Sequence, residues 1–447
     1  MADRVDAHFA PAGSLGGDLV APPDKSISHR AALIGAFGDG ETRIARYLDS
    51  ADSRSTLDAV RALGARVEVA ADGPGALAVE ISGFGLRGAS APDGAIDVGN
   101  AGTLIRLLSG LLAGQEDRDF VLDGDESIRS RPMGRVAEPL AEMGAAIETA
   151  SGGRPPVRIT GRRLRAIHYE LPVASAQVKS CVLLAGLLAE GRTTVREPAA
   201  TRDHSERMLR AAGAHVRVES EHPSLPTDPV ASTIGIAPAE RLVLPPMTVP
   251  GDLSSAAFHL AAGLIVPGAD VRIAGVGINP TRIGLLGILN RMGADVEVME
   301  QGFEGGEPVG SLRARHGHLQ AALVGASEVA TTIDELPLVG LLGCFAEGTT
   351  RIEGAEELRH KESDRIAGVV DALNALGGDA EALPDGFAVN GTGGLRGGEM
   401  DSLGDHRLAM LGAVAGLASA EGVTVRDFGA ARISYPGFET DLRSLLT

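Results

Sequence analysis

The chain has 447 residues, 44% of them hydrophobic and 22% charged, with a formal net charge of −18. This length exceeds one ordinary hydrophobic core and predicts two large domains. The acidic balance and the 3% of aromatic residues disfavour a nucleic-acid-binding surface. The longest apolar stretches, such as residues 182–189, are too short to span a membrane, and the N-terminus reads as neither a signal nor a transit peptide.

Along the chain, one pattern is predicted six times: a polar opening, an apolar helix of about a dozen residues, a turn containing glycine, and a β-branched strand. The copies begin at Ser28, Thr103, Ser175, Ser254, Asp334 and His406, so successive starts are 72 to 80 residues apart. Such periodicity predicts repeated units that bury their apolar faces against each other.

A second helix, turn and strand is predicted in five of the six intervals, and the sixth copy is either missing or reduced to residues 440–447. We expect left-handed helix caps at the turn glycines Gly64, Gly144, Gly213, Gly293 and Gly377. Six units divide into three plus three, and the Pro-rich stretch 238–255 lies between the third and fourth. We therefore place a domain junction there. An open solenoid is the alternative, although its repeats are usually shorter and more uniform.

The starts of the six apolar helices differ in their polar residues. Capping would explain Ser26, Thr103, Ser175 and Ser254. It does not explain the arginines at helix starts, which oppose the helix dipole and predict a bound anion or a carboxylate partner: Arg30, Arg106 and Arg407.

Connecting segments supply further cations, namely Arg129, Arg131, Arg135, Arg202, Lys361 and Arg365. Lys361 and Arg365 would share one face if a helix begins at Lys361. The chain has only three lysines, and a lysine retained among arginines indicates a need for a compact ammonium with a movable pKa. This idea suits Lys25 and Lys361, which lie in polar strings. Lys179 either reaches the same site or lies beside it.

Motifs for cofactors and metals are missing from the sequence. It contains no GxxxxGK[ST], no GxGxxG after a first strand, no HExxH and no CxxC. We therefore expect no metal and no cofactor. Cys181 and Cys344 form no disulfide framework, which suits a reducing cytoplasm.

Seven motifs occur in the order found in the 5-enolpyruvylshikimate-3-phosphate synthases: KSISHR, GNAGT, SRPMGR, ASAQVKS, TTIDELP, KESDR and DHRLAM. The resemblance covers about residues 24–438, and the segment TRDHSERML is similar to the class II branch. It implies an α/β fold of two domains, each with three βαβαββ repeats, in an inside-out α/β barrel. The implied domains are residues 24–241 and residues 1–23 plus 242–447.

The implied reaction joins shikimate 3-phosphate to phosphoenolpyruvate. The 5-hydroxyl of the first adds to C2 of the second, and the tetrahedral intermediate then eliminates phosphate. Carried over by motif, the residues expected to contact shikimate 3-phosphate are Lys25, Ser26, Arg30, Ser175, Ala176, Gln177, Arg202, Asp334 and Lys361. Those expected to hold phosphoenolpyruvate are Lys25, Gly102, Arg131, Gln177, Arg365 and Arg407, with Glu362 beside them.

These residue types suit the chemistry, because two polyanions must be brought together by fixed cations and forked guanidiniums. A hydroxyl must lose a proton and the enolpyruvyl methylene must gain one. Our hypotheses are that Asp334 acts on the hydroxyl, that Glu362 protonates the methylene, and that Lys25 is an electrostatic or proton-transfer partner. We expect a cytoplasmic monomer that binds these two small molecules and no nucleic acid or membrane.

Some positions depart from the family pattern. Ala176 replaces a serine, Glu357 replaces an asparagine of class I members, and Ile433 stands where a family lysine is expected, which leaves a role for Arg432 open. Gly102 is the form associated with glyphosate sensitivity, so we expect inhibition competitive with phosphoenolpyruvate.

Two other classes of protein compete with this interpretation. The sister transferase that acts on UDP-N-acetylglucosamine uses a loop cysteine near an Arg-Pro, whereas SRPM is preceded by no cysteine, and Cys181 falls in an apolar helix. A non-catalytic ring around a polymer would carry similar cations in every repeat, but GDLSS in the fourth repeat carries none.

Overall fold

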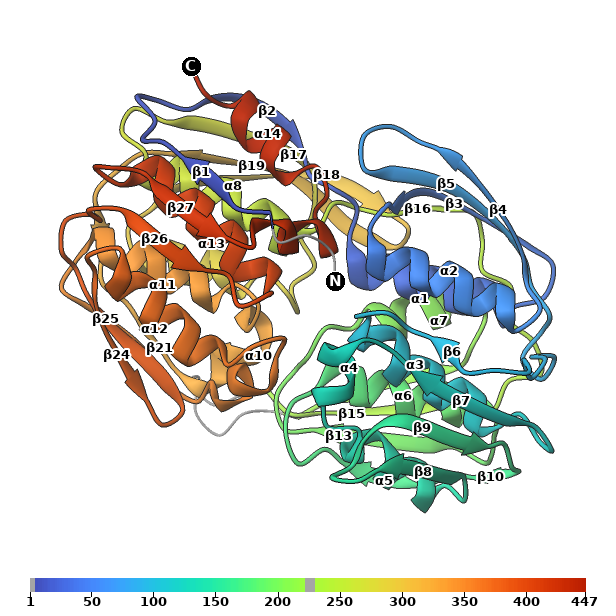
Figure 1. Ribbon diagram of the computed structural model, residues 1–447. Helices are drawn as coiled ribbons and strands as arrows, with labels where there is room; N and C mark the ends of the chain where they lie inside the picture. The colour runs from blue at the N-terminus through green and yellow to red at the C-terminus, as the bar shows by residue number, and fades with distance from the viewer. Residues whose placement is uncertain (1–4, 222–229) are drawn as a thin grey trace. The chain divides into compact units, whose positions relative to one another are not determined.

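The computed structural model describes residues 5–221 and 230–447, and its helices and strands alternate along the chain (Figure 1). Its residues divide into two compact units. Unit 1 comprises residues 1–22, 250–303 and 308–447, and unit 2 comprises residues 23–249 and 304–307. The α/β fold class expected from the sequence is confirmed.

Unit 2 contains the first three repeats. The first consists of α1 (Lys25–Ala36), β3 (Glu41–Leu48), α2 (Ala51–Ala62), β4 (Arg66–Ala71) and β5 (Ala76–Ser82). The second consists of β6 (Ile96–Asp97), α3 (Gly102–Ala113), β7 (Asp119–Asp123), α4 (Glu126–Ser130), α5 (Gly134–Glu142), β8 (Ala146–Ala150) and β9 (Arg154–Thr160). The third consists of β10 (Leu164–Arg165), β11 (His168–Glu170), α6 (Ala176–Gly186), β12 (Ala189–Glu190), β13 (Thr193–Glu197), α7 (His204–Ala211), β14 (Val216–Ser220) and β15 (Ser232–Ile236), and β16 (Met247–Thr248) follows.

Unit 1 contains β1 (Ala7–Phe9), β2 (Gly16–Val20) and the last three repeats. The fourth repeat has α8 (Leu253–Ile265), β17 (Asp270–Gly277), α9 (Gly284–Arg291), β18 (Asp295–Glu304) and β19 (Glu307–Arg315), although residues 304–307 belong to unit 2. The fifth has β20 (Leu319–Gln320), β21 (Leu323–Val324), α10 (Ala326–Thr332), α11 (Leu336–Phe345), β22 (Ala346–Glu347), β23 (Thr349–Ile352), η1 (Glu356–His360), α12 (Arg365–Ala375), β24 (Asp379–Leu383) and β25 (Gly386–Asn390). The sixth has β26 (Gly398–Asp401), α13 (His406–Ala418), β27 (Val423–Arg426), η2 (Phe428–Ile433) and α14 (Phe438–Ser444).

Five four-stranded sheets share one topology. In the orders β16-β3-β5-β4, β6-β7-β9-β8, β11-β13-β15-β14, β2-β17-β19-β18 and β21-β23-β25-β24, the first two strands are parallel. The third and fourth strands of each order are neighbours and continue the sheet beyond this parallel pair. The sixth repeat has the three-stranded order β1-β27-β26, and only the short helix α14 takes the place of its second helix and hairpin. The six predicted repeats are therefore present, the last in reduced form.

The core of each unit is built from the first helix of each repeat. Every residue of α3 and every residue of α8 is buried, as is expected of a helix that is apolar all round. Figure 1 shows these helices inside their units with the sheets outside them, so that each sheet keeps one face toward solvent. The candidate site residues described below lie at or near the N-terminal ends of α1, α3 and α6 in unit 2, and of α11 and α13 in unit 1.

The turn glycines were predicted correctly. The five glycines that follow the second helices all have positive φ: Gly64 (106°), Gly144 (97°), Gly213 (95°), Gly293 (70°) and Gly377 (91°). A side chain with a Cβ is strained in this region, so glycine is the residue that lets each helix turn back into its strand.

The predicted caps were only partly correct. Ser175 does cap α6 by accepting a hydrogen bond from the amide of Val178. Ser26, Thr103 and Ser254 lie inside their helices, whereas Asp24 and Asp252 are the caps of α1 and α8, and Ala101 precedes α3 without a side-chain cap. An aspartate two residues upstream takes the place of the hydroxyl in the first and fourth repeats, and its carboxylate also suits the positive end of the helix dipole.

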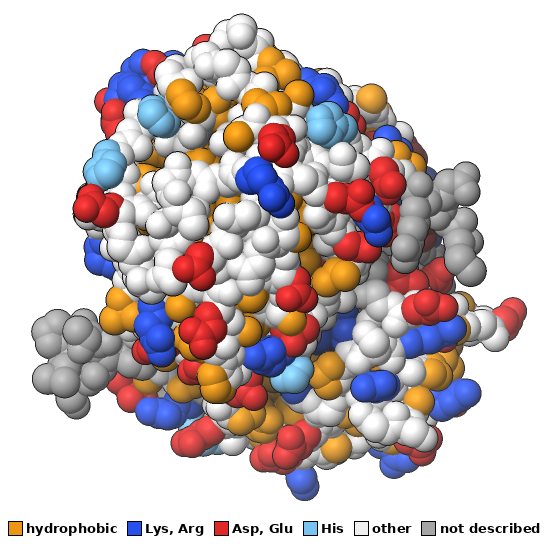
Figure 2. All heavy atoms as spheres, turned by 60° about the vertical axis from the view of Figure 1, so that its left-hand side comes forward, with side chains coloured by type: hydrophobic (Ala, Val, Ile, Leu, Met, Phe, Trp, Pro, Cys, Tyr) orange, Lys and Arg blue, Asp and Glu red, His pale blue; other side chains and the backbone are white. Residues whose placement is uncertain are grey.

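The surface drawn in Figure 2 intersperses acidic and basic side chains with scattered apolar ones, and no continuous basic stripe runs across the described residues of that face. Within residues 5–221 and 230–447, no helix combines the length and the apolar character that crossing a bilayer requires.

Candidate active site

Asp334 is the centre of an ionic group in unit 1. It lies between α10 and α11, and its carboxylate is 3.8 Å from Lys361 Nζ, 3.4 Å from Arg365 Nη1 and 3.6 Å from Arg407 Nη2. Arg365 begins α12 and Arg407 lies in the first turn of α13. Three cations therefore converge on one carboxylate from three different segments of the chain.

Arg365 is held in place by two further acids. Its Nη2 lies 2.6 Å from Glu362 and its Nε donates a 2.8 Å hydrogen bond to Asp405, which also caps α13. Burial acts to lower the pKa of Arg365, but Asp405 and Glu362 outweigh it and raise that pKa. Burial likewise acts to raise the pKa of Asp405, while Arg365 brings it below its usual value. The guanidinium is thus fixed and charged before any ligand arrives.

Lys361 is not helical, so it does not share a helix face with Arg365. It follows η1 and precedes the cap Asp364 of α12. Its ammonium nevertheless reaches the same carboxylate as Arg365 does. Burial lowers the pKa of Lys361, with Asp334 and Glu357 opposing the shift. An amine with a lowered pKa gives up a proton more readily than an exposed one does.

Gly102 and Arg131 form the centre of a second group, in unit 2. Arg131 donates hydrogen bonds of 3.0 Å to Asn100 and 3.1 Å to Ser127, and its Nη1 is 2.5 Å from the position that a Cβ on Gly102 would occupy. Arg106 donates a 2.5 Å bond to the amide oxygen of Gln177. The Gly102 backbone therefore lies against two guanidiniums, and a side chain here would displace the nearer one.

Gln177 links two helices of this group. Its amide nitrogen donates a 3.0 Å bond to Thr103 on α3, while its oxygen accepts from Arg106. Ser175 and Ala176 precede it as the cap and the first residue of α6. The orientation of the Gln177 side chain is set by these contacts.

Lys25, Ser26 and Arg30 lie in the first two turns of α1. Lys25 forms an ion pair of 3.1 Å with Asp52, the acid in the first turn of α2. Arg30 is buried and donates to Ser205, to Ser180 and to the carbonyl of Ser26. Arg202 is partly buried in the loop that precedes α7.

Each unit thus gathers its own predicted site residues. Asp334, Lys361, Glu362, Arg365 and Arg407 come together in unit 1, although they are spread over 74 residues of the chain. In unit 2, Gly102, Arg131 and Gln177 share one neighbourhood, and Arg30 lies near Arg202, whose charge contributes to the shift in the pKa of Arg30. Arg432 is exposed on η2.

Sequence reasoning missed two acidic partners. Asp52, which pairs with Lys25, was not distinguished from the other acids of its segment, and Asp405 appeared only as the first residue of the motif DHRLAM. The signal for Asp405 was the polar triplet that ends in Arg407 and interrupts an apolar stretch. No comparable signal marks Asp52.

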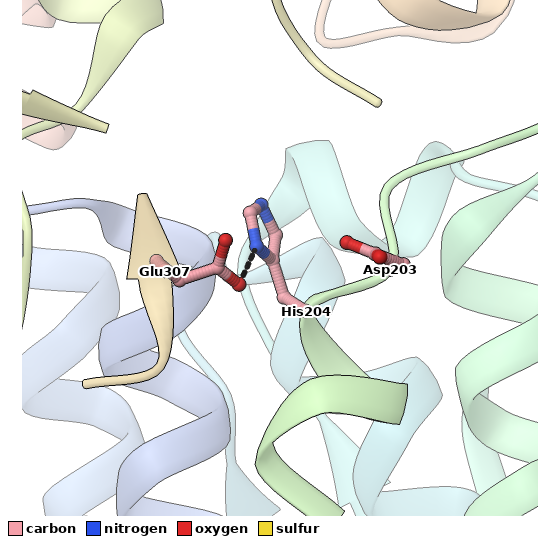
Figure 3. Close-up of side chains that lie close together, drawn as sticks. All are labelled: Asp203, His204 and Glu307. Carbon is pink, nitrogen blue, oxygen red and sulfur yellow. Dashed lines mark hydrogen bonds and ion pairs between the residues drawn. The ribbon is translucent and has the colours of Figure 1, made fainter. Parts of the chain in front are cut away.

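Asp203, His204 and Glu307 also lie close together, with ligand atoms within 4.8 Å of one another (Figure 3). His204 Nδ1 makes a 2.7 Å hydrogen bond with Glu307, and Asp203 accepts a 2.8 Å bond from Arg207. Figure 3 shows Glu307 and Asp203 on opposite sides of the imidazole ring. These bonds among the three residues and Arg207 account for the cluster as an ion-pair and hydrogen-bond network.

The family model and the curated relatives that match this chain carry the same enzyme name. The sequence model of EPSP synthase (3-phosphoshikimate 1-carboxyvinyltransferase) matches residues 10–442. A 3-phosphoshikimate 1-carboxyvinyltransferase of Synechococcus sp. (strain JA-3-3Ab) is 47% identical over 440 residues, which cover 98% of this chain and 96% of that one. The enzyme of the same name from Citrifermentans bemidjiense is 46% identical and covers 96% of both chains.

Solved structures match the fold over nearly the full length. The structure of EPSP synthase from Acinetobacter baumannii has a TM-score of 0.83 at 40% identity and covers 99% of both chains. The enolpyruvyl transferase NikO from Streptomyces tendae has a TM-score of 0.74 at 20% identity, covering 99% of this chain and 97% of that one, which shows a common fold alone.

Proposed function

The chain belongs to the EPSP synthase family, the 3-phosphoshikimate 1-carboxyvinyltransferases, and we propose that the groups around Asp334 and Gly102 carry out its reaction. The enzyme transfers the enolpyruvyl group of phosphoenolpyruvate to the 5-hydroxyl of shikimate 3-phosphate and releases phosphate, a step of the shikimate pathway. In the addition, the hydroxyl oxygen bonds to C2 and the methylene carbon takes up a proton. In the elimination, the new methyl group loses a proton as the C–O bond to phosphate breaks.

Phosphoenolpyruvate is the proposed ligand of Arg131, Arg365 and Arg407, together with Lys25, Gly102 and Gln177. Forked guanidiniums match both a carboxylate and a phosphate. The support in unit 1 is that Arg365 is buried and pre-positioned by Asp405 and Glu362. In unit 2, the support is that the Arg131 guanidinium packs directly against Gly102, in the space that a Cβ would take. Fixed cations of this kind cost little reorganisation when charge moves during the reaction.

Shikimate 3-phosphate is the proposed ligand of Lys25, Ser26, Arg30, Ser175, Ala176, Gln177, Arg202, Asp334 and Lys361. Its phosphate is the most highly charged part, and we assign it to Ser175 and Arg202. The N-terminal end of α6 supports this assignment because its first amides have no partner within the helix. Ala176 contributes through its backbone.

Asp334 is the proposed acceptor of the proton from the 5-hydroxyl, and the convergence of three cations on its carboxylate is the observation that carries the proposal. The anionic groups of the substrates would compete for those cations. Phosphoenolpyruvate bound to Arg365 and Arg407 would neutralise the cations that now face Asp334, which leaves the carboxylate able to accept a proton from the hydroxyl. Glu362, 2.6 Å from Arg365, is the proposed proton donor to the methylene, and Lys25 assists electrostatically.

Replacing Asp334 with asparagine tests this role. The amide keeps the shape but cannot accept the proton, so kcat is expected to fall by about 10²- to 10⁴-fold, while the Kd for shikimate 3-phosphate changes much less. Asp371→Asn, at an exposed position on α12, is the matched control and should retain full turnover. Near-normal kcat in a correctly folded Asp334→Asn enzyme would show that the assignment is wrong.

The protein is further proposed to act as a cytoplasmic monomer. Both cysteines are buried free thiols, which a reducing compartment maintains. Sedimentation equilibrium over a wide range of protein concentration tests the monomer. A mass near 45.8 kDa at every concentration is expected, and a concentration-dependent mass near twice that value would contradict it.

A further inference from the structure

Lys179 on α6 is the lysine that has no proposed contact with substrate, and it is the centre of a buried ionic cluster. Its ammonium lies 3.0 Å from Glu197 and 2.8 Å from Glu206, and it donates a 3.3 Å hydrogen bond to the carbonyl of Thr201. The side chains of Lys179 and Glu206 are each 1% exposed. Burying such charges is costly, and apolar residues of similar volume are often as stabilising. Stability alone therefore does not account for the cluster.

The partners of Lys179 enclose one loop. Glu197 is the last residue of β13, Glu206 lies in the first turn of α7, and Thr201 lies between them. Glu197 also accepts hydrogen bonds from the Thr201 amide (3.2 Å) and hydroxyl (2.6 Å). The Lys179 ammonium therefore contacts a residue on each side of the loop 198–203 and one residue within it. The next residue after Thr201 is Arg202.

A second set of contacts places another cation beside this loop. Arg30 donates to Ser205 (2.7 Å) and to Ser180 (3.0 Å), and Ser180 follows Lys179 on α6. Burial lowers the pKa of Arg30 to about 10; Glu206 opposes this shift and Arg202 adds to it. The charge of Arg202 is therefore felt at Arg30. Two like charges repel, so a loop that brings Arg202 toward Arg30 must be held by other contacts.

The charges of the cluster balance. Lys179 and Arg30 are cations, and Glu197 and Glu206 are anions. Burial acts to lower the pKa of Lys179, but Glu206 and Glu197 outweigh it and raise that pKa, so the ammonium stays charged. Arg30 and Arg202 are both guanidiniums of the kind that binds a phosphate. A phosphate bound by both would reduce the repulsion between them.

We propose that Lys179 is a positioning residue that holds Arg202, through Glu197, Thr201 and Glu206, in place for the phosphate of shikimate 3-phosphate. The proposal rests on the assignment of Arg202 in the proposed function. Lys179 does not touch the substrate, so its effect passes entirely through the loop. The affinity for the phosphate group should depend on Lys179, whereas the affinity for the ring should not.

The test compares shikimate 3-phosphate with unphosphorylated shikimate by isothermal titration calorimetry. The double variant Lys179→Met/Glu206→Gln removes one charge of each sign and so leaves the net charge unchanged. It is expected to bind shikimate 3-phosphate about tenfold more weakly, as for one displaced charge-assisted hydrogen bond, and to bind shikimate as before. In an Arg202→Ala background, the same double change should alter the affinity for shikimate 3-phosphate by less than about twofold.

Controls separate positioning from general destabilisation. Ile159→Ala, in the buried face of β9, lowers stability without touching the loop and should leave the preference for the phosphorylated ligand intact. Glu197→Gln keeps the shape of the cluster and weakens the ion pair between Lys179 and residue 197. This variant provides the measurement if the double variant fails to fold. It should shift the preference in the same direction as the double variant.

Four outcomes would overturn the proposal. An equal loss of affinity for shikimate and shikimate 3-phosphate would show a general defect, and a tenfold effect that persists in the Arg202→Ala background would show that Lys179 does not act through Arg202. If Arg202→Ala weakens binding of shikimate 3-phosphate but neither cluster variant does, the positioning role alone is wrong. If Arg202→Ala itself has no effect, the assignment of Arg202 is wrong, and the positioning role falls with it.

Discussion

Replacing Gly102 with alanine should weaken the binding of phosphoenolpyruvate without weakening the fold. The added Cβ would lie 2.5 Å from Arg131 Nη1 and 3.1 Å from Arg106 Nη1, whereas ordinary contact begins at 3.4 Å. The Arg131 guanidinium must therefore move by about 0.9 Å. Because Nη1 is the end of a flexible side chain, the movement costs the fold little, but it misplaces a group proposed to hold the substrate.

The expected size of the change in KM follows from the free energy of the hydrogen bond between the Arg131 guanidinium and the substrate. A hydrogen bond between a guanidinium and an anion contributes about 1.5–3 kcal/mol, so its loss corresponds to an increase of about 10- to 150-fold in the KM for phosphoenolpyruvate. Gly102 is the first residue of α3 and its φ is not positive, so alanine is tolerated by the backbone. The midpoint of thermal unfolding should be unchanged or slightly higher.

The assay is steady-state phosphate release with each substrate varied in turn. Gly102→Ala should raise the KM for phosphoenolpyruvate, leave that for shikimate 3-phosphate within about twofold, and weaken inhibition by glyphosate, which we expect to compete with phosphoenolpyruvate. Gly134→Ala is the matched control, because a Cβ at this exposed position would meet no atom within 4 Å. A KM for phosphoenolpyruvate within about twofold of the wild-type value would refute the assignment of Arg131 and Gly102 to that substrate.

Three further predictions concern individual contacts. Asp52→Asn removes the charge that holds Lys25, so kcat/KM from initial rates should fall by about tenfold; an unchanged value would contradict this role. Burial raises the pKa of the Cys181 and Cys344 thiols to about 12, so a disulfide reagent should label neither thiol until urea unfolds the chain, and rapid labelling with loss of activity would oppose this. Burial lowers the pKa of His259 to about 3, so the folded state cannot take up the proton that the unfolded state binds below pH 6.5, and stability is lost as pH falls toward 3. At pH 5 the loss should be about 2 kcal/mol, and urea unfolding of His259→Gln should show a pH dependence shallower by that amount; an identical dependence would count against it.

The repeats could be predicted from the sequence because their signals are local. A helix period, a turn glycine and a β-branched strand are all contained within about 35 residues, and the positive φ at Gly64 and Gly377 is a direct consequence of that pattern. The convergence of Asp334, Arg365 and Arg407 was expected only through the family resemblance. Nothing in the local pattern fixes which of many acids and arginines meet in space.

The errors have the same cause. Ser26 and Ser254 looked like caps because hydroxyls are favoured there, but where a helix starts depends on how the preceding strand enters it, and Asp24 and Asp252 occupy the caps. The partners of Lys179 could not be inferred either. Glu197 and Glu206 lie 18 and 27 residues further along the chain, and only the packing of α6 against β13 and α7 brings them to the ammonium.

The most direct test of the central claim is the release of inorganic phosphate by the purified protein in the presence of shikimate 3-phosphate and phosphoenolpyruvate, with each omitted in turn. The account predicts release only when both are present, in equal amount to the enolpyruvyl product, and none when UDP-N-acetylglucosamine replaces shikimate 3-phosphate. Release with phosphoenolpyruvate alone, or equal release with UDP-N-acetylglucosamine as the acceptor, would contradict it.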